Sequence, residues 1–247
     1  MNIALFGYGK MGKEVERVAI ARGHEIAGRF DVGDPLDANA LRNASIDVAI
    51  DFTEASAVPS HVKAAAEAGI AIVIGTTGWE PQLENIKKHV AEFKIGCMIG
   101  SNFSVGVNLF LDIVRIASRE LDAAGYDAYV LEAHHNMKKD FPSGTALRLG
   151  EAVLEGMRTK SKMISRLPDG EAIPSDALLI SSIRAGTIAG KHIVGFDSDE
   201  DSIEFIHTAK SRKGFASGAV RAAEWIEHKT GFFRFEEVIG DVLGSAS

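Results

Sequence analysis

The 247-residue sequence predicts an α/β protein with two domains, a parallel-sheet domain followed by an α+β domain with a mixed sheet. In the first hundred residues, short apolar runs alternate with segments of helical period, which is typical of a parallel sheet with crossover helices. After residue 177, three apolar runs follow one another with only short turns between them, which indicates neighbouring strands of a second sheet. The length of the chain is compatible with one or two domains.

Composition and charge narrow the class of protein. The chain has 27 Lys and Arg against 34 Asp and Glu, a net charge of −7, and its basic residues are scattered, so we expect no nucleic-acid partner. Cys97 is the only cysteine, which excludes an internal disulfide and a cysteine-based zinc cluster and fits a buried thiol in a reducing compartment. No segment reaches the roughly 18 apolar residues of a membrane span. We therefore expect a cytoplasmic protein without a membrane partner.

The first strand, residues 2–6, runs directly into a glycine loop, and a helix is predicted over residues 13–22. The loop reads G-x-G-x-x-G, in which the first glycine permits a tight turn, the second lets the backbone approach a pyrophosphate, and the third allows close packing of the helix on the strand. The pattern predicts a Rossmann-type dinucleotide site. The expected contacts come from the whole loop, namely Gly7, Tyr8, Gly9, Lys10, Met11 and Gly12.

An acidic residue supports this interpretation. A second strand over residues 25–30 leads to Asp31, where the acceptor for the ribose hydroxyl groups of a dinucleotide is expected. The alternative is a glycine turn of some other α/β protein, with Asp31 as a surface charge at the end of a strand.

The alternation continues with strands over residues 46–52, 70–74 and 95–99 and helices over 58–68 and 81–92. Two small loops follow the second and third of these strands, at the carboxyl ends where open parallel sheets bind ligands. A plain turn is the alternative for each loop. The cofactor contacts expected from them are Gly75, Thr76, Thr77, Gly100, Ser101, Asn102 and Phe103.

The stretch from Glu132 to Ala146 carries the densest chemistry in the chain. It follows a strand at 127–132 and includes His134, His135 and Lys138. Ser143 is expected to cap a helix that runs to about residue 157, with the following backbone N–H groups free to bind a carboxylate or phosphate. Taken singly, these residues could be a structural histidine, a solvated lysine and a simple cap; together they favour a functional site.

The remaining segments complete the predicted domains. A helix is expected over residues 105–123, a loop or crossover over 159–175, and strands over 177–184, 192–197 and 202–209; a last helix over 218–228 and the segment 235–242 return to the first domain. The expected domains are residues 1–103, completed by 216–247, and residues 104–215.

These motifs together resemble the 4-hydroxy-tetrahydrodipicolinate reductase family, also called dihydrodipicolinate reductase, of lysine and diaminopimelate biosynthesis. The resemblance covers nearly the whole chain and rests on four ordered motifs, at residues 75–78, 102–108, 132–146 and 184–186. It implies a Rossmann domain, a substrate domain that forms a homotetramer, and reduction of a cyclic 4-hydroxy dicarboxylate by NADH or NADPH with loss of water. It implies no metal.

The resemblance also implies roles for single residues. His134 is similar to the proton-transfer histidine of the family and Lys138 to its proton donor, while the substrate is expected to contact His135, Ser143, Gly144 and Thr145. The chain departs from the family pattern in a glycine loop shorter by one residue, in Lys10 at a usual arginine, and in Asn136, Met137 and Phe141.

The residues leave the coenzyme and two other functions open. Asp31 favours NADH, while Arg29 and Lys10 could approach the 2′-phosphate of NADPH, so we expect use of both coenzymes with NADH ahead. The glycine motif alone also fits another two-domain amino-acid dehydrogenase, or a regulator that binds NAD(H) without turnover. The His-His-x-x-Lys and Pro-Ser-Gly-Thr motifs argue against the dehydrogenase, and the presence of both proton carriers argues against the regulator.

Overall fold

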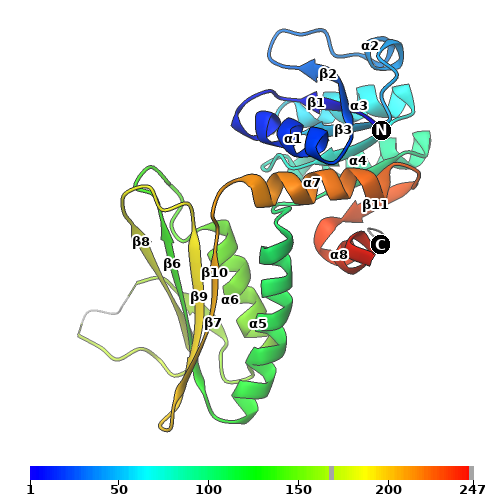
Figure 1. The fold of residues 1–247 in the computed structure, drawn as a ribbon. Coiled ribbons are helices and arrows are strands. Elements are labelled where there is room, and N and C mark those ends of the chain that lie inside the picture. Colours follow the sequence, from blue (N-terminus) through cyan, green and yellow to red (C-terminus); the bar gives the residue numbers. More distant parts are fainter. Residues whose placement is uncertain (167–169, 245–247) are drawn as a thin grey trace. The chain divides into compact units, whose positions relative to one another are not determined.

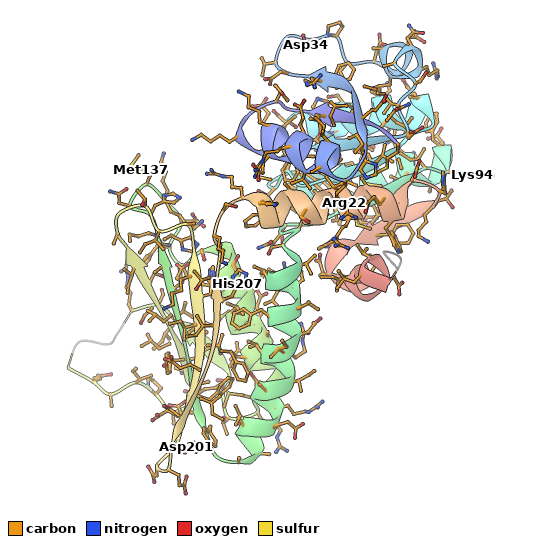
Figure 2. All side chains as sticks on the ribbon, viewed as in Figure 1. Arg22, Asp34, Lys94, Met137, Asp201 and His207 are labelled. Carbon is orange, nitrogen blue, oxygen red and sulfur yellow. The ribbon has the colours of Figure 1, made fainter. Side chains whose placement is uncertain are left out.

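The computed structural model describes residues 1–166 and 170–244. The chain divides into two compact units, Met1–Val105 with Arg212–Ser247 and Gly106–Ser211. Figure 1 shows the elements of each unit, and Figure 2 adds their side chains. The first unit is therefore built from both ends of the sequence.

The first unit contains a six-stranded parallel sheet in the order β11-β5-β4-β3-β1-β2. Every residue of the three strands β3, β4 and β5 is buried, as expected where helices cover both faces of a parallel sheet. The strands are β1 (Asn2–Phe6), β2 (Glu25–Phe30), β3 (Val48–Asp51), β4 (Ala71–Ile74), β5 (Gly96–Ile99) and β11 (Gly231–Arg234).

Helices cover both faces of this sheet. One apolar cluster contains residues of α1 (Lys10–Ala21), α7 (Lys213–Ile226) and α8 (Phe235–Gly244), and a second cluster on the other face contains residues of α2 (Ala38–Asn43), α3 (Val58–Ala68) and α4 (Leu83–Phe93). A short 3-10 helix, Glu80–Gln82, precedes α4. The small residues of α7 allow close packing, since a Cβ at Gly218 would lie 1.6 Å from the carbonyl oxygen of Phe103.

The second unit contains a mixed five-stranded sheet in the order β10-β9-β6-β8-β7, with helices α5 (Val105–Ala123) and α6 (Gly144–Gly156) on one face (Figure 1). Strand β8 pairs in parallel with both β6 and β7. Strand β9 pairs antiparallel with β6 and with the edge strand β10. Apolar residues recur at helical spacing along α5 and pack on the sheet. The strands are β6 (Asp127–His134), β7 (Lys162–Ile164), β8 (Ala177–Arg184), β9 (Lys191–Asp197) and β10 (Ser202–Thr208).

The predicted fold class is confirmed, with local corrections. Helix α2 and strand β11 were not predicted from the sequence, and the segment expected to be a loop contains β7, although residues 167–169 of that segment lie outside the described residues. Strand β6 continues to His134, and α1 begins at Lys10 rather than at Lys13. Cys97 is a buried free thiol, as expected. Among residues 1–166 and 170–244, no helix combines the length and apolar character needed to cross a membrane.

Candidate active site

The glycine loop of the first unit leaves open space beside the start of α1. Gly7 has φ +86° and a Cβ there would lie 2.4 Å from the carbonyl oxygen of Phe52, while a Cβ at Gly12 would lie 2.2 Å from the carbonyl oxygen of Gly7. A Cβ at Gly9 meets nothing within 4 Å. Gly9 is also the N-cap of α1 and provides no side-chain cap. The loop therefore fits a dinucleotide pyrophosphate, with backbone N–H groups and open space at Gly9.

The other residues of the loop have different environments. Lys10 is exposed, and Met11 packs against the apolar cluster under α1. Tyr8 donates a hydrogen bond to Glu16, which also pairs with Arg29, and the Arg29 guanidinium lies 5.5 Å from the centre of the Tyr8 ring. The pKa of Glu16 is lowered, chiefly because Arg29 stabilises the carboxylate. Arg29 is thus paired with an acid rather than available to a phosphate.

Asp31 lies at the end of β2, beside the glycine loop. The backbone N–H of Gly7 donates to the carbonyl of Phe30, which brings the ends of β1 and β2 together. The Asp31 side chain is exposed, and its backbone N–H donates to the carboxylate of Asp34 at 2.8 Å. Two acids therefore lie where the ribose is expected, and of these only Asp31 was predicted.

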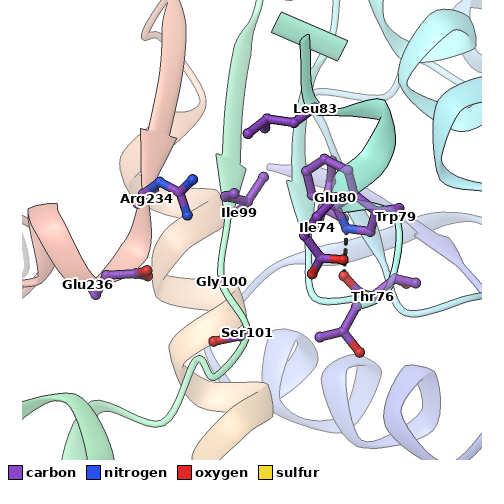
Figure 3. A pocket seen from close by; sticks show the side chains of 11 residues that line it. Ile74, Thr76, Trp79, Glu80, Leu83, Ile99, Gly100, Ser101, Arg234 and Glu236 are labelled. Carbon is purple, nitrogen blue, oxygen red and sulfur yellow. Dashed lines mark hydrogen bonds between the residues drawn. The ribbon is translucent and has the colours of Figure 1, made fainter. Parts of the chain in front are cut away.

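A buried aspartate fixes the loop after β4. Oδ1 of Asp51, at the end of β3, accepts from the Oγ1 atoms of Thr53 and Thr76, at 2.7 and 2.8 Å, and Oδ2 lies 2.7 Å from Nδ1 of His61. The indole N–H of Trp79 donates to the carbonyl of Thr76 at 2.7 Å (Figure 3). Asp51 and Trp79 were not predicted to contribute to the site, yet they hold Thr76 from both sides.

A pocket of about 70 Å³ opens at the carboxyl ends of β4, β5 and β11 (Figure 3). Of the predicted cofactor residues, Thr76, Thr77, Gly100 and Ser101 line it. The pocket is also lined by residues that were not predicted from the sequence, chiefly Trp79, Leu83, Arg234 and Glu236. Arg234 ends β11, so only the strand pairing brings it here.

The last two predicted cofactor residues do not line this pocket. Asn102 is buried, and its Oδ1 accepts from the backbone N–H of Ser104 at 2.8 Å. Phe103 is a core residue whose ring lies 4.8 Å from that of Phe235. The side chain of Phe103 therefore packs in the core and supports the loop of residues 100–103 instead of lining the pocket.

In the second unit, strand pairing brings the predicted catalytic stretch together with two distant residues. His134 ends β6 and is in register with Arg184 on the parallel strand β8, while Glu132 is in register with His192 on the antiparallel strand β9. Glu132 and His134 are two residues apart, so their side chains lie on the same face of the sheet. Glu132, His134 and His192 are buried. Arg184 was noted only as part of a motif, and no signal from the sequence alone located His192.

Glu132 is a buried anion with three hydrogen bonds to one oxygen. Its Oε1 accepts from the backbone N–H of Ser143 at 2.9 Å, from Oγ of Ser182 at 2.7 Å and from the Arg184 guanidinium at 2.8 Å. Burial raises the pKa of Glu132, but these hydrogen bonds outweigh it and lower the pKa to about 2. The carboxylate is therefore ionised at neutral pH.

The predicted proton carriers lie close to this anion. Burial lowers the pKa of His134, so that its imidazole is neutral at pH 7. Lys138 is half-buried in the following loop and forms an ion pair with Asp140, with Nζ and Oδ1 2.8 Å apart. His135 is half-buried beside them. His134 and Lys138 therefore belong to the same end of the sheet.

Ser143 caps α6 as predicted, and its Oγ accepts from the backbone N–H of Ala146 at 3.2 Å. The expectation that the following N–H groups are all free is wrong. Burial raises the pKa of Asp140, but Lys138 and the backbone N–H of Gly144 lower it further, so an acid of the chain itself already lies at the start of the helix. Gly144 and Thr145 form the first turn of α6.

Glu132, His134 and His192 could also be considered as metal ligands, since one potential ligand atom of each lies within 4.8 Å of the others. The Arg184 guanidinium already compensates the carboxylate of this group at 2.8 Å. We therefore describe the cluster as a network of hydrogen bonds and ion pairs.

The glycine loop of the first unit and the cluster of ionisable side chains in the second are typical of one class of protein, the two-domain dinucleotide-binding oxidoreductases. The models of the N-terminus and C-terminus of dihydrodipicolinate reductase match residues 1–103 and 106–239. The chain belongs to the dihydrodipicolinate reductase family. This confirms the family, the fold class and the reductase class predicted from the sequence.

Individual relatives agree with this assignment. A 4-hydroxy-tetrahydrodipicolinate reductase of Christiangramia forsetii is 36% identical, over 98% of this chain and 99% of the relative, and that of Methanosarcina barkeri is 43% identical over 81% and 75%. The dipicolinate-bound dihydrodipicolinate reductase from Paenisporosarcina sp. TG-14 has the same fold, with a TM-score of 0.77, 22% identity and coverage of 96% and 99%. A diaminopimelate dehydrogenase of C. glutamicum shares the fold more distantly, with a TM-score of 0.55, 13% identity and coverage of 98% and 95%.

Proposed function

We propose that this enzyme reduces 4-hydroxy-2,3,4,5-tetrahydrodipicolinate to 2,3,4,5-tetrahydrodipicolinate with loss of water, in lysine and diaminopimelate biosynthesis, using NADH or NADPH. One observation carries the proposal: His134 and Lys138 belong to the same end of a sheet as the start of α6, in a chain of the reductase family. The names of the relatives and the dipicolinate bound to the solved neighbour support a dicarboxylate as substrate.

The residues have distinct tasks in this reaction. A bound nicotinamide supplies the hydride. Lys138 holds a proton at Nζ and delivers it to the carbon next to the one that accepts the hydride, and the neutral imidazole of His134 transfers a proton in the same region. His135, Gly144 and Thr145 hold the substrate carboxylates at the start of α6, where backbone N–H groups favour anions and where a substrate carboxylate replaces Asp140 as the acceptor of the Gly144 N–H. Ser143 keeps this helix start in place through its cap.

The preferred coenzyme follows from the acids at the end of β2. Asp31 and Asp34 repel the 2′-phosphate of NADPH and can accept hydrogen bonds from the ribose of NADH. Arg29 is paired with Glu16, which removes one cation that could offset this repulsion. We therefore expect the enzyme to use both coenzymes with NADH ahead.

The assembly and location are part of the proposal. Ile183 and Ile206 are about half exposed, and by strand alternation from the core residues Ile180 and Phe205 they lie on the face of the second sheet that α5 and α6 do not cover. Such a face supports a homotetramer formed through the second unit. The single free Cys97 fits the cytoplasm.

An oxidation assay tests the proposal. The purified chain is mixed with NADH and the hydroxylated substrate, generated enzymatically in the same cuvette, and NADH absorbance is followed with Lys138→Ala as the matched control. We expect rapid oxidation that the control largely loses. Binding of NADH without oxidation would instead indicate a regulator, and activity only with amino acids and oxidised coenzyme would indicate an amino-acid dehydrogenase.

A further inference from the structure

Glu132 lies at the centre of the second-unit site and has no contact with solvent. A buried carboxylate is unfavourable unless neighbouring groups compensate its charge. Oε1 is fully compensated by Ser143, Ser182 and Arg184. The other oxygen, Oε2, accepts none of these hydrogen bonds, so its surroundings decide what else this residue does.

Oε2 faces two imidazoles. It lies 3.0 Å from Nδ1 of His134 and 3.8 Å from Nε2 of His192, and the two rings meet edge to face with centres 5.1 Å apart. Among residues 1–166 and 170–244, neither Oε2 nor His134 Nδ1 has a hydrogen bond of good geometry. These two buried atoms lie 3.0 Å apart and are therefore left to satisfy each other.

An ionised carboxylate beside Nδ1 determines which imidazole nitrogen carries the proton. The proton is stabilised on Nδ1, where it points at Oε2, and the lone pair is then on Nε2. Space on that side of the ring depends on Gly190, since a Cβ there would lie 3.2 Å from Nε2, and the φ of +152° favours glycine. His134 therefore has a fixed inner nitrogen and an outer nitrogen that no side chain of residue 190 covers.

We propose that Glu132 is a positioning residue that holds His134 in the Nδ1-protonated tautomer and directs its Nε2 toward the reacting molecule. The inference rests on the proposed function only in that His134 transfers a proton there. Through its other oxygen, Glu132 also fixes Ser143 at the start of α6 and the guanidinium of Arg184. One carboxylate thereby fixes the position of the proton carrier relative to the anion-binding helix start.

The charges around His134 give a second, pH-dependent consequence. Burial lowers the pKa of His134 most; the Glu132 and Asp140 carboxylates raise it, and the Lys138 and Arg184 cations lower it. The neighbouring His192 is neutral at pH 7, because burial lowers its pKa to about 4. Loss of the Glu132 charge must lower the pKa of His134 further. The limb of the pH–rate profile that reports His134 then moves to lower pH, whichever protonation state acts.

Glu132→Gln gives a specific test, because its amide has one acceptor and one donor. The three donors that bind Oε1 select the amide oxygen for that position, which places the NH₂ group opposite His134 Nδ1. A donor at this position forces Nδ1 to accept and moves the imidazole proton to Nε2. The tautomer is therefore expected to invert.

The experiment measures the tautomer by ¹⁵N NMR of the full chain labelled at histidine, with the His134 signals assigned by their loss in His134→Asn. We expect the Nδ1–H form in the wild type, the Nε2–H form in Glu132→Gln, and a fall in kcat of about 10² with little change in substrate KM. Glu155→Gln is the matched control, because this exposed carboxylate near the end of α6 contacts Arg115 of the same unit; it should change neither the tautomer nor kcat.

Two results would overturn the inference. An Nε2–H tautomer in the wild type refutes it even if Glu132→Gln does not fold, and an active Glu132→Gln with unchanged tautomer and kcat refutes it as well. Failure of the proposed function looks different. In that case the wild type does not oxidise NADH with the hydroxylated substrate, while the NMR measurement still decides the contact between Glu132 and His134.

Discussion

Gly9 and Gly12 allow the fold and the cofactor site of the first unit to be perturbed separately. A Cβ at Gly12 would lie 2.2 Å from the carbonyl oxygen of Gly7, and neither backbone segment can move without disturbing β1 or α1. Overpacking of this kind costs about 1–3 kcal/mol. For a chain of this size, a cost of about 2 kcal/mol lowers Tm by about 4–8 °C. Gly12→Ala is therefore expected to be a stability variant.

Gly9→Ala is expected to weaken cofactor binding and to leave stability unchanged. The added methyl group meets nothing within 4 Å, and Gly9 has an extended backbone with a negative φ of −77°, so alanine needs no left-handed conformation there. The small loss of N-cap preference is offset by the lower entropy of the unfolded chain, so Tm should not change. The methyl group should instead occupy the open space where we expect the pyrophosphate. A cost of about 1.4 kcal/mol there weakens NADH binding tenfold.

Differential scanning fluorimetry and calorimetric titration with NADH measure the two effects. We expect a lowered Tm for Gly12→Ala, and wild-type Tm with weakened NADH binding for Gly9→Ala. If Gly9→Ala bound NADH as tightly as the wild type, the pyrophosphate would not lie against the start of α1. If Gly12→Ala kept its Tm, the contact with Gly7 would not be tight.

Four further results are expected. Lys138→Ala or His134→Ala should lower kcat by about 10² to 10⁴. NADH affinity should not change, because both residues lie in the second unit. An unchanged kcat in both variants would remove their proposed roles. Thr145→Val should raise substrate KM more than it lowers kcat, since a hydrogen bond to a carboxylate is present in ground and transition states alike; steady-state kinetics with only kcat changed would contradict this. Asp31→Ser should shift kcat/KM toward NADPH by removing a charge that repels the 2′-phosphate; no shift would place the ribose elsewhere. Burial lowers the pKa of His192 from 6.5 to about 4, so the unfolded chain binds a proton that the folded chain does not, and the free energy of unfolding should fall as pH falls from about 6.5 to 4. Urea titrations at pH 7 and pH 4 should show a smaller fall in the free energy of unfolding for His192→Asn than for the wild type. An equal fall in both proteins would assign the effect to other groups.

The sequence predicted the elements whose pattern is local. Strand β1 and helices α3 and α5 carry their own apolar period and their own boundary residues, so their positions followed from the chain alone. Two of the missed elements, β11 and β7, depend on distant partners. β11 pairs with β5, more than a hundred residues earlier in the chain, and the three residues of β7 are a strand only because they pair with β8. No local period marks such segments.

The same distinction applies to the site. Glu132 and His134 stand two positions apart in a strand, so alternation alone could have placed them on one face. His192 faces them only through the register of β6 with β9, and the pairing of Arg184 with Glu132 depends on the neighbouring strand β8. The Asp140 carboxylate at the start of α6 also follows from the course of a loop, which residue spacing does not determine.

Helix α7 and strand β11 come from the end of the chain but belong to the first unit, and this has a consequence for how the protein is made. Ala219, Ala223 and Ile226 of α7 are fully buried against the first sheet. During translation, residues 1–105 therefore emerge with an apolar face that stays uncovered until α7 is synthesised. The second unit is continuous in sequence and can complete its core first. A chain that stops before α7 would expose this face and would be a substrate for chaperones or proteases.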